Sequence, residues 1–413
     1  MSSQKYQNLD EILRQTVVCI LAGGKGERLM PLTEHRAKPA VTFGAKYRVI
    51  DFVMSNCVNS DLNKIYIFPQ HLNQSLNEHL LAGWNIFHTE RDQFMRIVSP
   101  QGRVSDAWYT GTAASVHENF HSIGIADPKY VIVLSSDQIY KMDYREVLQS
   151  HIDTKAELTI VALPVKQSEA HRYGVLKIDK RRRIKGFVEK PTVPEEIPGR
   201  PGESLASTAI YIFNSKTLVE TLNQDRAIKT SSHDFGKDVI PRMLRQKRRV
   251  FAYLFQDQAG RPKHWVDIGN PDAFFEANMD LVSSRPKFDL YDKSWPWRTC
   301  QSPIPPQKFV SRAKIESSVV SDGCVFGNCT IKKAIISPKV KIGDETTISD
   351  SIIMGCAQIG DNVRISRAII DKYSVIPDNT VIDAESTDYQ GDFTITPSGI
   401  VIIPRKCSEW AGR

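Results

Sequence analysis

The hydrophobic positions of the chain follow two periods, and the change from one to the other divides the sequence. Between residues 16 and about 285, short apolar runs that suit buried strands alternate with stretches of helical spacing. Such alternation predicts an α/β domain whose mostly parallel sheet is covered by helices on both faces. The strand-like runs are Val17–Leu21, Lys64–Pro69, Tyr130–Leu134 and Leu158–Val165, and Tyr144–His151 has helical spacing.

The last part of the chain has another pattern, in which β-branched residues recur every 17 positions. Within one repeat they advance by 6, 6 and 5 residues, and an Ile-Gly-Asp corner at Ile342 recurs at Ile359. This spacing is typical of the hexapeptide parallel β-helix, whose coils must stack before their apolar faces are buried. The rows predicted to point inward are Val319, Ile336, Ile353 and Ile370; Val325, Ile342, Ile359 and Ile376; and Ile331, Ile348, Ile365 and Ile382.

These patterns divide the chain into four parts. Residues 1–15 are expected to be a mobile tail or a short helix, and residues 16–285 form the α/β domain. Residues 286–310 are rich in proline and contain Trp295 and Trp297, which predicts an extended linker packed on a domain face. Residues 311–413 form the β-helix.

Composition and charge narrow the class of protein. A chain of 413 residues with 41% hydrophobic and 24% charged residues suits a soluble globular protein with more than one core. It has no apolar run of the roughly 18 residues that a membrane helix needs and no apolar signal segment. Seven scattered cysteines argue against a disulfide framework, so we expect a cytoplasmic protein without a membrane partner.

The net charge of +7 suits small anionic ligands. The one dense basic run, Lys180–Arg183, lies between two strand-like segments, 175–178 and 184–188, and is expected to be a solvated hairpin turn. Neither aromatic platforms nor a recognition helix accompany it, so we expect no nucleic-acid partner.

A glycine-rich loop follows the first predicted strand. Gly23, Gly24 and Gly26 let the backbone turn sharply and bring its N–H groups against a ligand, and Arg28 and Lys38 follow. This combination suits a polyphosphate, although a tight strand exit would also account for the glycines. Two familiar motifs do not fit: a Walker loop needs Ser or Thr where Gly26 stands, and a dinucleotide fingerprint needs Gly or Ala at Leu29.

The stretch from Val17 to Val41 resembles the sugar-nucleotide pyrophosphorylases, whose motif is Leu-Ala-Gly-Gly-x-Gly-Thr-Arg-Leu followed by Pro-Leu-Thr and Lys-Pro. The segments Arg36–Val41, Tyr47–Phe52 and Ser55–Ser60 are similar to one branch, the glucose-1-phosphate adenylyltransferases. The resemblance continues to near the C-terminus. It implies a Rossmann-like nucleotidyltransferase domain followed by a left-handed β-helix. It also implies a homotetramer, with a hetero-oligomer containing a paralogue left open.

The implied reaction joins ATP and glucose 1-phosphate to give ADP-glucose and pyrophosphate. The attacking phosphate is already ionised near neutrality, so catalysis reduces to positioning and charge neutralisation by cations, with Mg²⁺ as cofactor. The family holds the metal with aspartates in motifs that match Asp137 and Asp267. Each Asp ends a strand-like run and, judged from its spacing alone, would be read as a cap or turn residue.

The resemblance also assigns substrate positions. Lys190 and Asp234 have structural alternatives, since the first precedes a turn-forming proline and the second could cap a helix. The catalytic set is Arg28, Lys38 and Asp137; the nucleotide set is Leu21, Ala22, Gly23, Gly24, Gly26, Gln70, Gly111 and Thr112; and the glucose 1-phosphate set is Tyr109, Glu189, Lys190, Ser207 and Asp234.

Enzymes of this branch are regulated by sugar phosphates or other anions bound between the domains. The matching positions are His35, Arg36, Arg48 and Arg405. Separate surface arginines are the alternative. Because some relatives have lysine where His35 stands, the effector stays open.

The chain departs from the family pattern at Glu27, Thr110, Ala114, Ser136, Gln138 and Ala209. A side chain at Ser136, where glycine is usual, is expected to crowd a close-packed backbone. Three functions therefore remain. The leading one is an active ADP-glucose pyrophosphorylase feeding glycogen or α-glucan synthesis. The second is a catalytically weakened regulatory subunit of a pyrophosphorylase assembly, and the third is transfer of a uridylyl, thymidylyl or guanylyl group.

Overall fold

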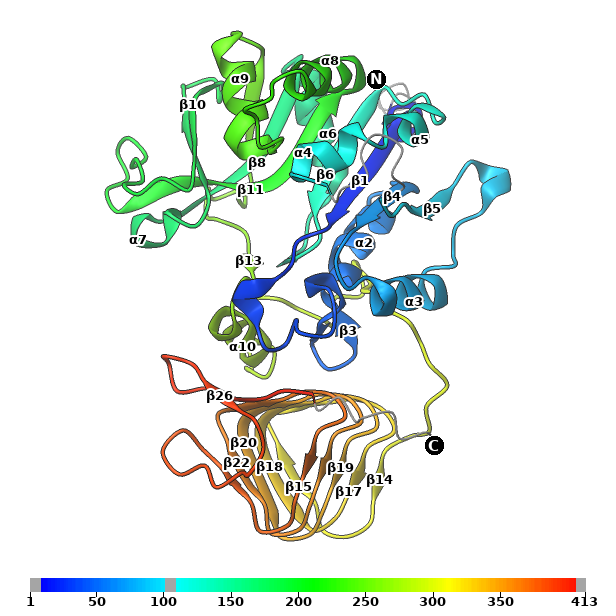
Figure 1. The fold of residues 1–413 in the computed structure, drawn as a ribbon, viewed down its shortest axis with the longest axis vertical. Helices are drawn as coiled ribbons and strands as arrows, with labels where there is room; N and C mark the ends of the chain where they lie inside the picture. The colour runs from blue at the N-terminus through cyan, green and yellow to red at the C-terminus, as the bar shows by residue number, and fades with distance from the viewer. Residues whose placement is uncertain (1–8, 101–108, 406–413) are drawn as a thin grey trace.

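The structure, a computed structural model of the chain, describes residues 9–100 and 109–405. An α/β domain carries the first part of the chain and a β-helix the last (Figure 1). Of the predicted N-terminal tail, residues 9–14 form a short helix, and residues 1–8 lie outside the described part.

The central sheet of the α/β domain is built around β1 (Thr16–Ala22). Strands β4 (Lys64–Pro69) and β6 (Tyr130–Ser135) flank it in parallel, and β5 (Phe94–Ile97) continues the parallel part beyond β4. On the other side of β6, β11 (Glu203–Asn214) runs antiparallel. The sheet is therefore parallel from β6 through β1 and β4 to β5, and it is mixed from β11 onward.

Four further strands complete this sheet beyond β11. Strand β8 (Leu158–Lys166) pairs with β11 and with β12 (Val250–Leu254). Strands β9 (Gly174–Ile178) and β10 (Ile184–Glu189) form a hairpin whose turn contains the basic run Lys180–Arg183. The predicted hairpin turn is confirmed.

Helices cover both faces of the sheet because the side chains of β1 alternate between two hydrophobic cores. Val18 and Ile20 belong to the core under α2 (Val49–Asn59), α3 (Gln74–Gly83) and α6 (Tyr144–Asp153). Val17 and Cys19 belong to the opposite core, which is covered by α4 (Thr112–His117), α5 (Phe120–Gly124), α8 (Ser215–Arg226) and α9 (Ile240–Arg245). The predicted two-sided cover is confirmed.

A separate two-stranded sheet lies beyond the carboxyl end of β6. Strand β7 (Gln138–Tyr140) pairs antiparallel with β13 (Trp265–Asp267), and Asp267 lies opposite Gln138. This pairing brings two strand-end aspartates, Asp137 and Asp267, to the same place. Helix α10 (Pro271–Asp280) follows β13.

The proline-rich segment after α10 packs on α2, as its two tryptophans suggested. The indole N–H of Trp295 donates to Asn56 Oδ1 at 2.9 Å, and the N–H of Arg298 donates to Ser55 Oγ at 2.9 Å. The Trp297 ring packs against Phe52. The predicted linker thus forms part of the α/β domain surface.

The β-helix consists of short parallel strands stacked coil on coil (Figure 1). One sheet contains β14 (Lys308–Phe309), β17 (Val325–Phe326), β19 (Lys341–Ile342), β21 (Gln358–Ile359) and β24 (Val375–Ile376). The other contains β15 (Lys314–Glu316), β16 (Val319–Val320), β18 (Cys329–Ile336), β20 (Thr346–Ile353), β22 (Arg364–Ser366), β23 (Ala368–Ile370), β25 (Val381–Ile382), β26 (Thr394–Ile395) and β27 (Val401–Ile403).

Ten of the twelve residues predicted to point inward belong to the β-helix core, and Val319 and Val325 are wrong. Val320 pairs with Ile336 and Phe326 with Ile342, so the inward residues of this coil lie one position later than predicted. The physical reason is a five-residue step between Phe326 and Ile331, where a six-residue step was expected.

A second row of isoleucines, next to the inward row, joins the two domains. Ile335, Ile352 and Ile369 lie in one hydrophobic cluster with Phe274 and Phe275 of α10. Val319 packs against this cluster and so belongs to the domain interface. Within residues 9–100 and 109–405, every helix is too short or too polar to cross a lipid bilayer.

Candidate active site

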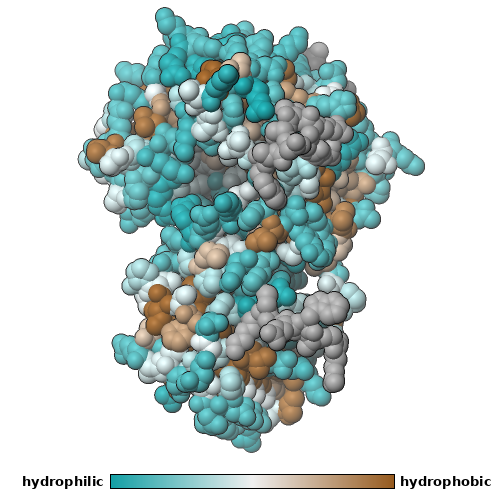
Figure 2. Space-filling view, viewed as in Figure 1, coloured by the Kyte–Doolittle hydropathy of each residue, from teal (hydrophilic) through white to brown (hydrophobic). Residues whose placement is uncertain are grey.

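A cleft of about 670 Å³ opens at the carboxyl ends of β1 and β6. Figure 2 shows a hollow in this region of the α/β domain, between the β9–β10 hairpin and the end of β1. Every residue predicted for catalysis, nucleotide, sugar phosphate or metal lines it: Leu21, Ala22, Gly23, Gly24, Gly26, Arg28, Lys38, Gln70, Tyr109, Gly111, Thr112, Asp137, Glu189, Lys190, Ser207, Asp234 and Asp267.

The glycine loop is held in shape by close packing. Gly26 adopts a φ of +70°, which favours glycine, and its carbonyl accepts a hydrogen bond from Thr33 Oγ1 at 2.9 Å. A Cβ at Gly23 would lie 2.8 Å from Gln70 Oε1, so a larger residue there would displace the Gln70 side chain. The loop ends in a short 3₁₀ helix, η1 (Glu27–Leu29), which carries Arg28.

Lys38 lies between the two aspartates. Its Nζ is 2.8 Å from Asp137 Oδ2 and 3.2 Å from Asp267 Oδ1. The guanidinium of Arg28 approaches Asp267 from the glycine loop, at 4.0 Å. Lys38 is the first residue of the short helix η2 (Lys38–Ala40) and is buried. Because it is buried, its charge is not screened by bulk water.

The cluster stays charged despite its burial. Burial opposes ionisation of Asp137, but the charge of Lys38 and hydrogen bonds from Lys38 and Ser135 outweigh it and lower the pKa of Asp137. Burial likewise opposes the charge of Lys38, and the two carboxylates outweigh it and raise the pKa of Lys38. Two carboxylates beside the cleft fit Mg²⁺, which prefers one or two carboxylates and takes its other ligands from phosphates and water.

The other end of the cleft is built around Glu189. A Cβ at Gly236 would lie 2.5 Å from Glu189 Oε2, and one at Gly174 would lie 2.9 Å from it, so two glycines enclose the carboxylate. Burial raises the pKa of Glu189, Lys190 opposes the shift, and Asp234 adds to it. Lys190 Nζ lies 3.7 Å from Glu189 Oε1 and lines the cleft.

Asp234 has a structural role as well as a place in the cleft. Its Oδ1 accepts hydrogen bonds from the N–H groups of Gly236 and Lys237 and so caps the helical turn η4 (Phe235–Val239). Its Oδ2 accepts from Thr112 Oγ1 at 3.0 Å, which links the predicted sugar side to the predicted nucleotide side.

A cationic cluster, which we call the interdomain basic cluster, consists of Arg36, Arg48, Lys372 and Arg405. Arg36 forms a buried ion pair with Asp371 of the β-helix, so this contact crosses the domain interface. Burial and the charges of the three arginines lower the pKa of Lys372 to about 8. His35, predicted with this group, is exposed beside Arg36.

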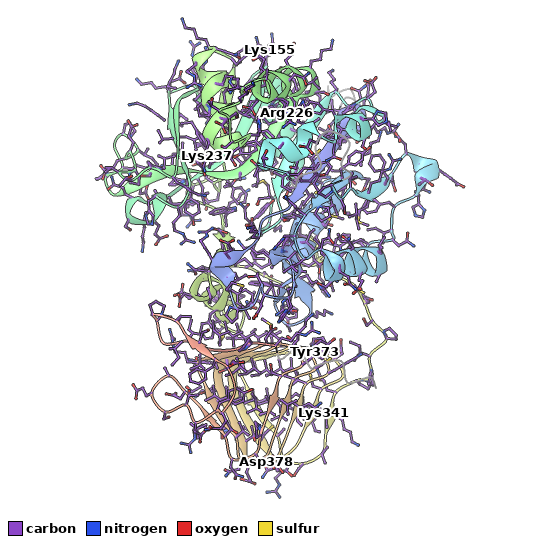
Figure 3. The ribbon with its side chains drawn as sticks, in the orientation of Figure 1. Lys155, Arg226, Lys237, Lys341, Tyr373 and Asp378 are labelled. Carbon is purple, nitrogen blue, oxygen red and sulfur yellow. The ribbon has the colours of Figure 1, made fainter. Side chains whose placement is uncertain are left out.

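The cluster contains buried donors without partners among the described residues. Arg36 Nη1 and Arg405 Nε are buried and donate no hydrogen bond to any described residue. The Arg405 guanidinium lies 5.0 Å from the ring centroid of Tyr373. Figure 3 shows Tyr373 on the part of the β-helix that faces the α/β domain, away from Lys341 and Asp378. The predicted arginines are therefore near the domain interface and are not separate surface residues.

Comparisons with known proteins agree with this architecture. Residues 17–284 match the nucleotidyl transferase family, and residues 305–403 match the GlmU-like C-terminal hexapeptide family. The chain is 42% identical to glucose-1-phosphate adenylyltransferase 2 of Vibrio cholerae over 95% of this chain and 98% of that protein. It is 44% identical to the Thermus thermophilus glucose-1-phosphate adenylyltransferase over 94% of this chain and 97% of the relative.

The chain belongs to the glucose-1-phosphate adenylyltransferase family. Two of its departures from the family pattern are accommodated by hydrogen bonds. Ser136 Oγ donates to the carbonyl of Leu21 at 2.7 Å, so the expectation that a side chain here would crowd the backbone is wrong. Gln138 Nε2 donates to the carbonyl of Thr208 at 2.8 Å, and its Oε1 accepts from the Trp265 indole at 3.0 Å.

The structure adds two cations that the family motifs did not single out. Arg172 lines the cleft, with one guanidinium nitrogen 3.8 Å from Asp267 Oδ2. Lys372 belongs to the interdomain basic cluster. For Arg172 the available signal was a cation shortly before the predicted strand 175–178, and for Lys372 it was a basic residue two positions after the inward Ile370.

Proposed function

We propose that the protein transfers the adenylyl group of ATP to glucose 1-phosphate and releases pyrophosphate. A phosphate oxygen of the sugar phosphate attacks the α-phosphorus, and the bond from the α-phosphorus to the oxygen bridging it to the β-phosphate breaks. The attacking oxygen carries no proton near neutrality, so the step needs no general base. The single observation that carries the proposal is Lys38 held between Asp137 and Asp267 in a cleft lined by the glycine loop.

Different residues of the cleft would bind different parts of the two substrates. The backbone N–H groups of the loop and Arg28 would bind the triphosphate, and Lys38 would face the charge that develops as pyrophosphate leaves. Glu189 and Lys190 would bind the sugar hydroxyls and the sugar phosphate. Mg²⁺, when bound by Asp137 and Asp267, would neutralise triphosphate charge and fix its orientation. Because the two carboxylates already share a cation, a free metal ion would have to compete with Lys38.

The interdomain basic cluster is proposed as the site of an anionic effector. Buried guanidinium donors without partners favour an anion there, since an unsatisfied buried donor costs about 1–3 kcal/mol. A sugar phosphate or a nucleotide has the chemistry to satisfy them. Because Arg36 comes from the α/β domain and Lys372 from the β-helix, such an anion would act on both domains.

Three further proposals concern the oligomeric state of the protein, its cellular compartment and the use of its product. The parallel β-helix offers stacking surfaces for a homotetramer, and the described cysteines are free thiols, which suits a reducing cytoplasm. The product, ADP-glucose, would feed α-glucan or glycogen synthesis, because it is an activated glucosyl donor.

The test offers the purified full chain glucose 1-phosphate and Mg²⁺ with ATP, UTP, dTTP or GTP, and measures pyrophosphate. Release chiefly with ATP is expected. Asp137→Asn is the matched control, since it keeps the shape of the side chain and removes its charge. Release chiefly with another triphosphate would replace the adenylyl group in the proposal, and no release with any of them would leave a regulatory subunit as the better account.

A further inference from the structure

Arg172 presents a buried cationic donor to the cleft without a hydrogen-bond partner among the described residues. It lies between α7 (Gln167–Ala170) and β9. Its Nη2 atom is buried, and the nearest charged atom given for it, Asp267 Oδ2, is 3.8 Å away, beyond hydrogen-bond distance. The side chain lines the same cleft as Lys38 and Glu189.

The backbone around Arg172 belongs to the sugar-phosphate side of the cleft. The carbonyl of Tyr173 accepts a hydrogen bond from the N–H of Lys190 at 3.0 Å, and Gly174 packs against the Glu189 carboxylate. The Tyr173 ring packs edge-on against Trp265, with ring centroids 5.4 Å apart, which anchors this segment to β13.

Arg172 and Arg28 therefore approach the same carboxylate oxygen of Asp267 from two different segments. Arg28 comes from the glycine loop, at 4.0 Å, and Arg172 comes from the segment next to Glu189 and Lys190, at 3.8 Å.

A buried guanidinium nitrogen that lacks a hydrogen bond costs free energy, which a ligand with paired oxygens would recover. Phosphate is such a ligand, because its oxygens match the planar fork of arginine. We propose that Arg172 binds the phosphate group of the sugar phosphate and makes the site selective for a phosphorylated sugar. This inference rests on the proposed function.

Arg172 has one competing role, which is to orient Asp267 for the metal. The two roles differ in what they change. A residue that binds the sugar phosphate changes affinity for that substrate. A residue that only orients Asp267 changes the Mg²⁺ concentration for half-maximal activity and leaves sugar-phosphate affinity as it was.

The experiment titrates glucose 1-phosphate into the full chain by calorimetry, with α,β-methylene ATP and Mg²⁺ present so that no reaction occurs. The variants are Arg172→Ala, Arg172→Lys, and Arg181→Ala as a control in the exposed hairpin turn. Arg172→Ala should weaken glucose 1-phosphate binding about tenfold or more, while a separate titration of α,β-methylene ATP should give an affinity within about twofold of wild type. Arg172→Lys should recover part of the affinity, because it restores the charge without the fork. Circular dichroism and thermal unfolding establish that each variant is folded.

Unchanged glucose 1-phosphate binding in folded Arg172→Ala would overturn the proposal, and so would an equal loss for both substrates or a change confined to the Mg²⁺ dependence. Failure of the proposed function is a different result. In that case the wild-type chain would release no pyrophosphate with any triphosphate, or would release it with one other than ATP, whatever Arg172 does to sugar-phosphate binding.

Discussion

The ammonium nitrogen of Lys38 lies 2.8 Å from Asp137 Oδ2, and the two residues are 99 positions apart in the chain. The contact exists because the glycine loop after β1 and the carboxyl end of β6 meet at one edge of a parallel sheet. Asp267 joins them through the pairing of β13 with β7. One cation therefore lies between two carboxylates at the edge of the sheet, and it lowers the pKa of Asp137.

Replacing Lys38 with methionine should lower kcat by about 10²-fold or more, the usual effect of removing one preorganised charge from a transition state. The change also removes the cation that lowers the pKa of Asp137, so the pKa of Asp137 should rise. Pyrophosphate release measured across pH reports both effects. Lys46→Met, at an exposed position, is the control. Activity of Lys38→Met within about threefold of wild type would contradict the role given to this lysine.

Asp225 should be important for the stability of the sugar side of the cleft. Its buried carboxylate accepts hydrogen bonds from His233 Nδ1 at 2.7 Å, from Arg242 at 2.9 Å and from Ser231 Oγ at 2.8 Å. Asp225→Asn removes the charge that Arg242 faces, and breaking a buried pair costs about 3–5 kcal/mol. We expect a lower urea midpoint for the α/β domain.

The matched control for Asp225 is Asp10→Asn, at an exposed position. Because the backbone carbonyl of His233 accepts the N–H of Ala113 at 2.8 Å, the variant should also loosen the loop at Gly111 and Thr112. An unfolding free energy within about 0.5 kcal/mol of wild type, the range of ordinary surface changes, would show that the network contributes little.

The protein should be more stable with glycine in place of Ala209. Ala209 has a φ of 55°, in β11 where the pairing with β8 shifts register between Ser207 and Tyr211. The left-handed conformation costs an alanine about 1–2 kcal/mol, and the extra flexibility of glycine in the unfolded chain offsets about 0.5–1 kcal/mol of the gain. Ala209→Gly should therefore raise the free energy of unfolding by up to about 1 kcal/mol, measured by urea denaturation.

Ala206→Gly, in the same strand, tests whether this gain comes from the backbone conformation. Ala206 is buried and is not among the residues with positive φ, so its replacement should destabilise the domain. Equal losses from both substitutions would mean that the conformation of Ala209 carries no strain.

The local hydrophobic pattern of the sequence was enough to predict the strands and helices, but it did not predict every contact between them. The strand Lys64–Pro69 has the predicted bounds, and the inward isoleucines from Ile331 onward are confirmed, because alternation and six-residue spacing are local properties. Asp137 and Asp267 could be paired only through family resemblance, since a β7–β13 pairing across more than a hundred residues leaves no local signal. Arg172 and Lys372 were missed for the same reason: what distinguishes them is the charge brought near them by distant segments.

The charge of Lys372 depends on pH in a range that is easily studied. Burial and the charges of Arg36, Arg48 and Arg405 lower its pKa to about 8, and Asp371 opposes the shift. In the unfolded chain a lysine has a pKa of about 10.4. Folding therefore penalises the charged form: the penalty is fully present below pH 8 and disappears as pH rises from about 8 to 10.4. Over that window, this residue should make the wild-type protein more stable as pH increases.

An anion bound in the interdomain basic cluster should reverse this preference, because it stabilises the charged lysine. Inorganic phosphate should therefore raise the thermal unfolding temperature more at pH 7 than at pH 9, and Lys372→Met should reduce that difference while making the phosphate-free protein more stable at pH 7. Lys341→Met, on the β-helix away from Tyr373 (Figure 3), is the control and should leave both results unchanged. Equal phosphate stabilisation of wild type and Lys372→Met at both pH values would mean that Lys372 does not take part in anion binding, and the pH dependence would then have to arise elsewhere in the cluster.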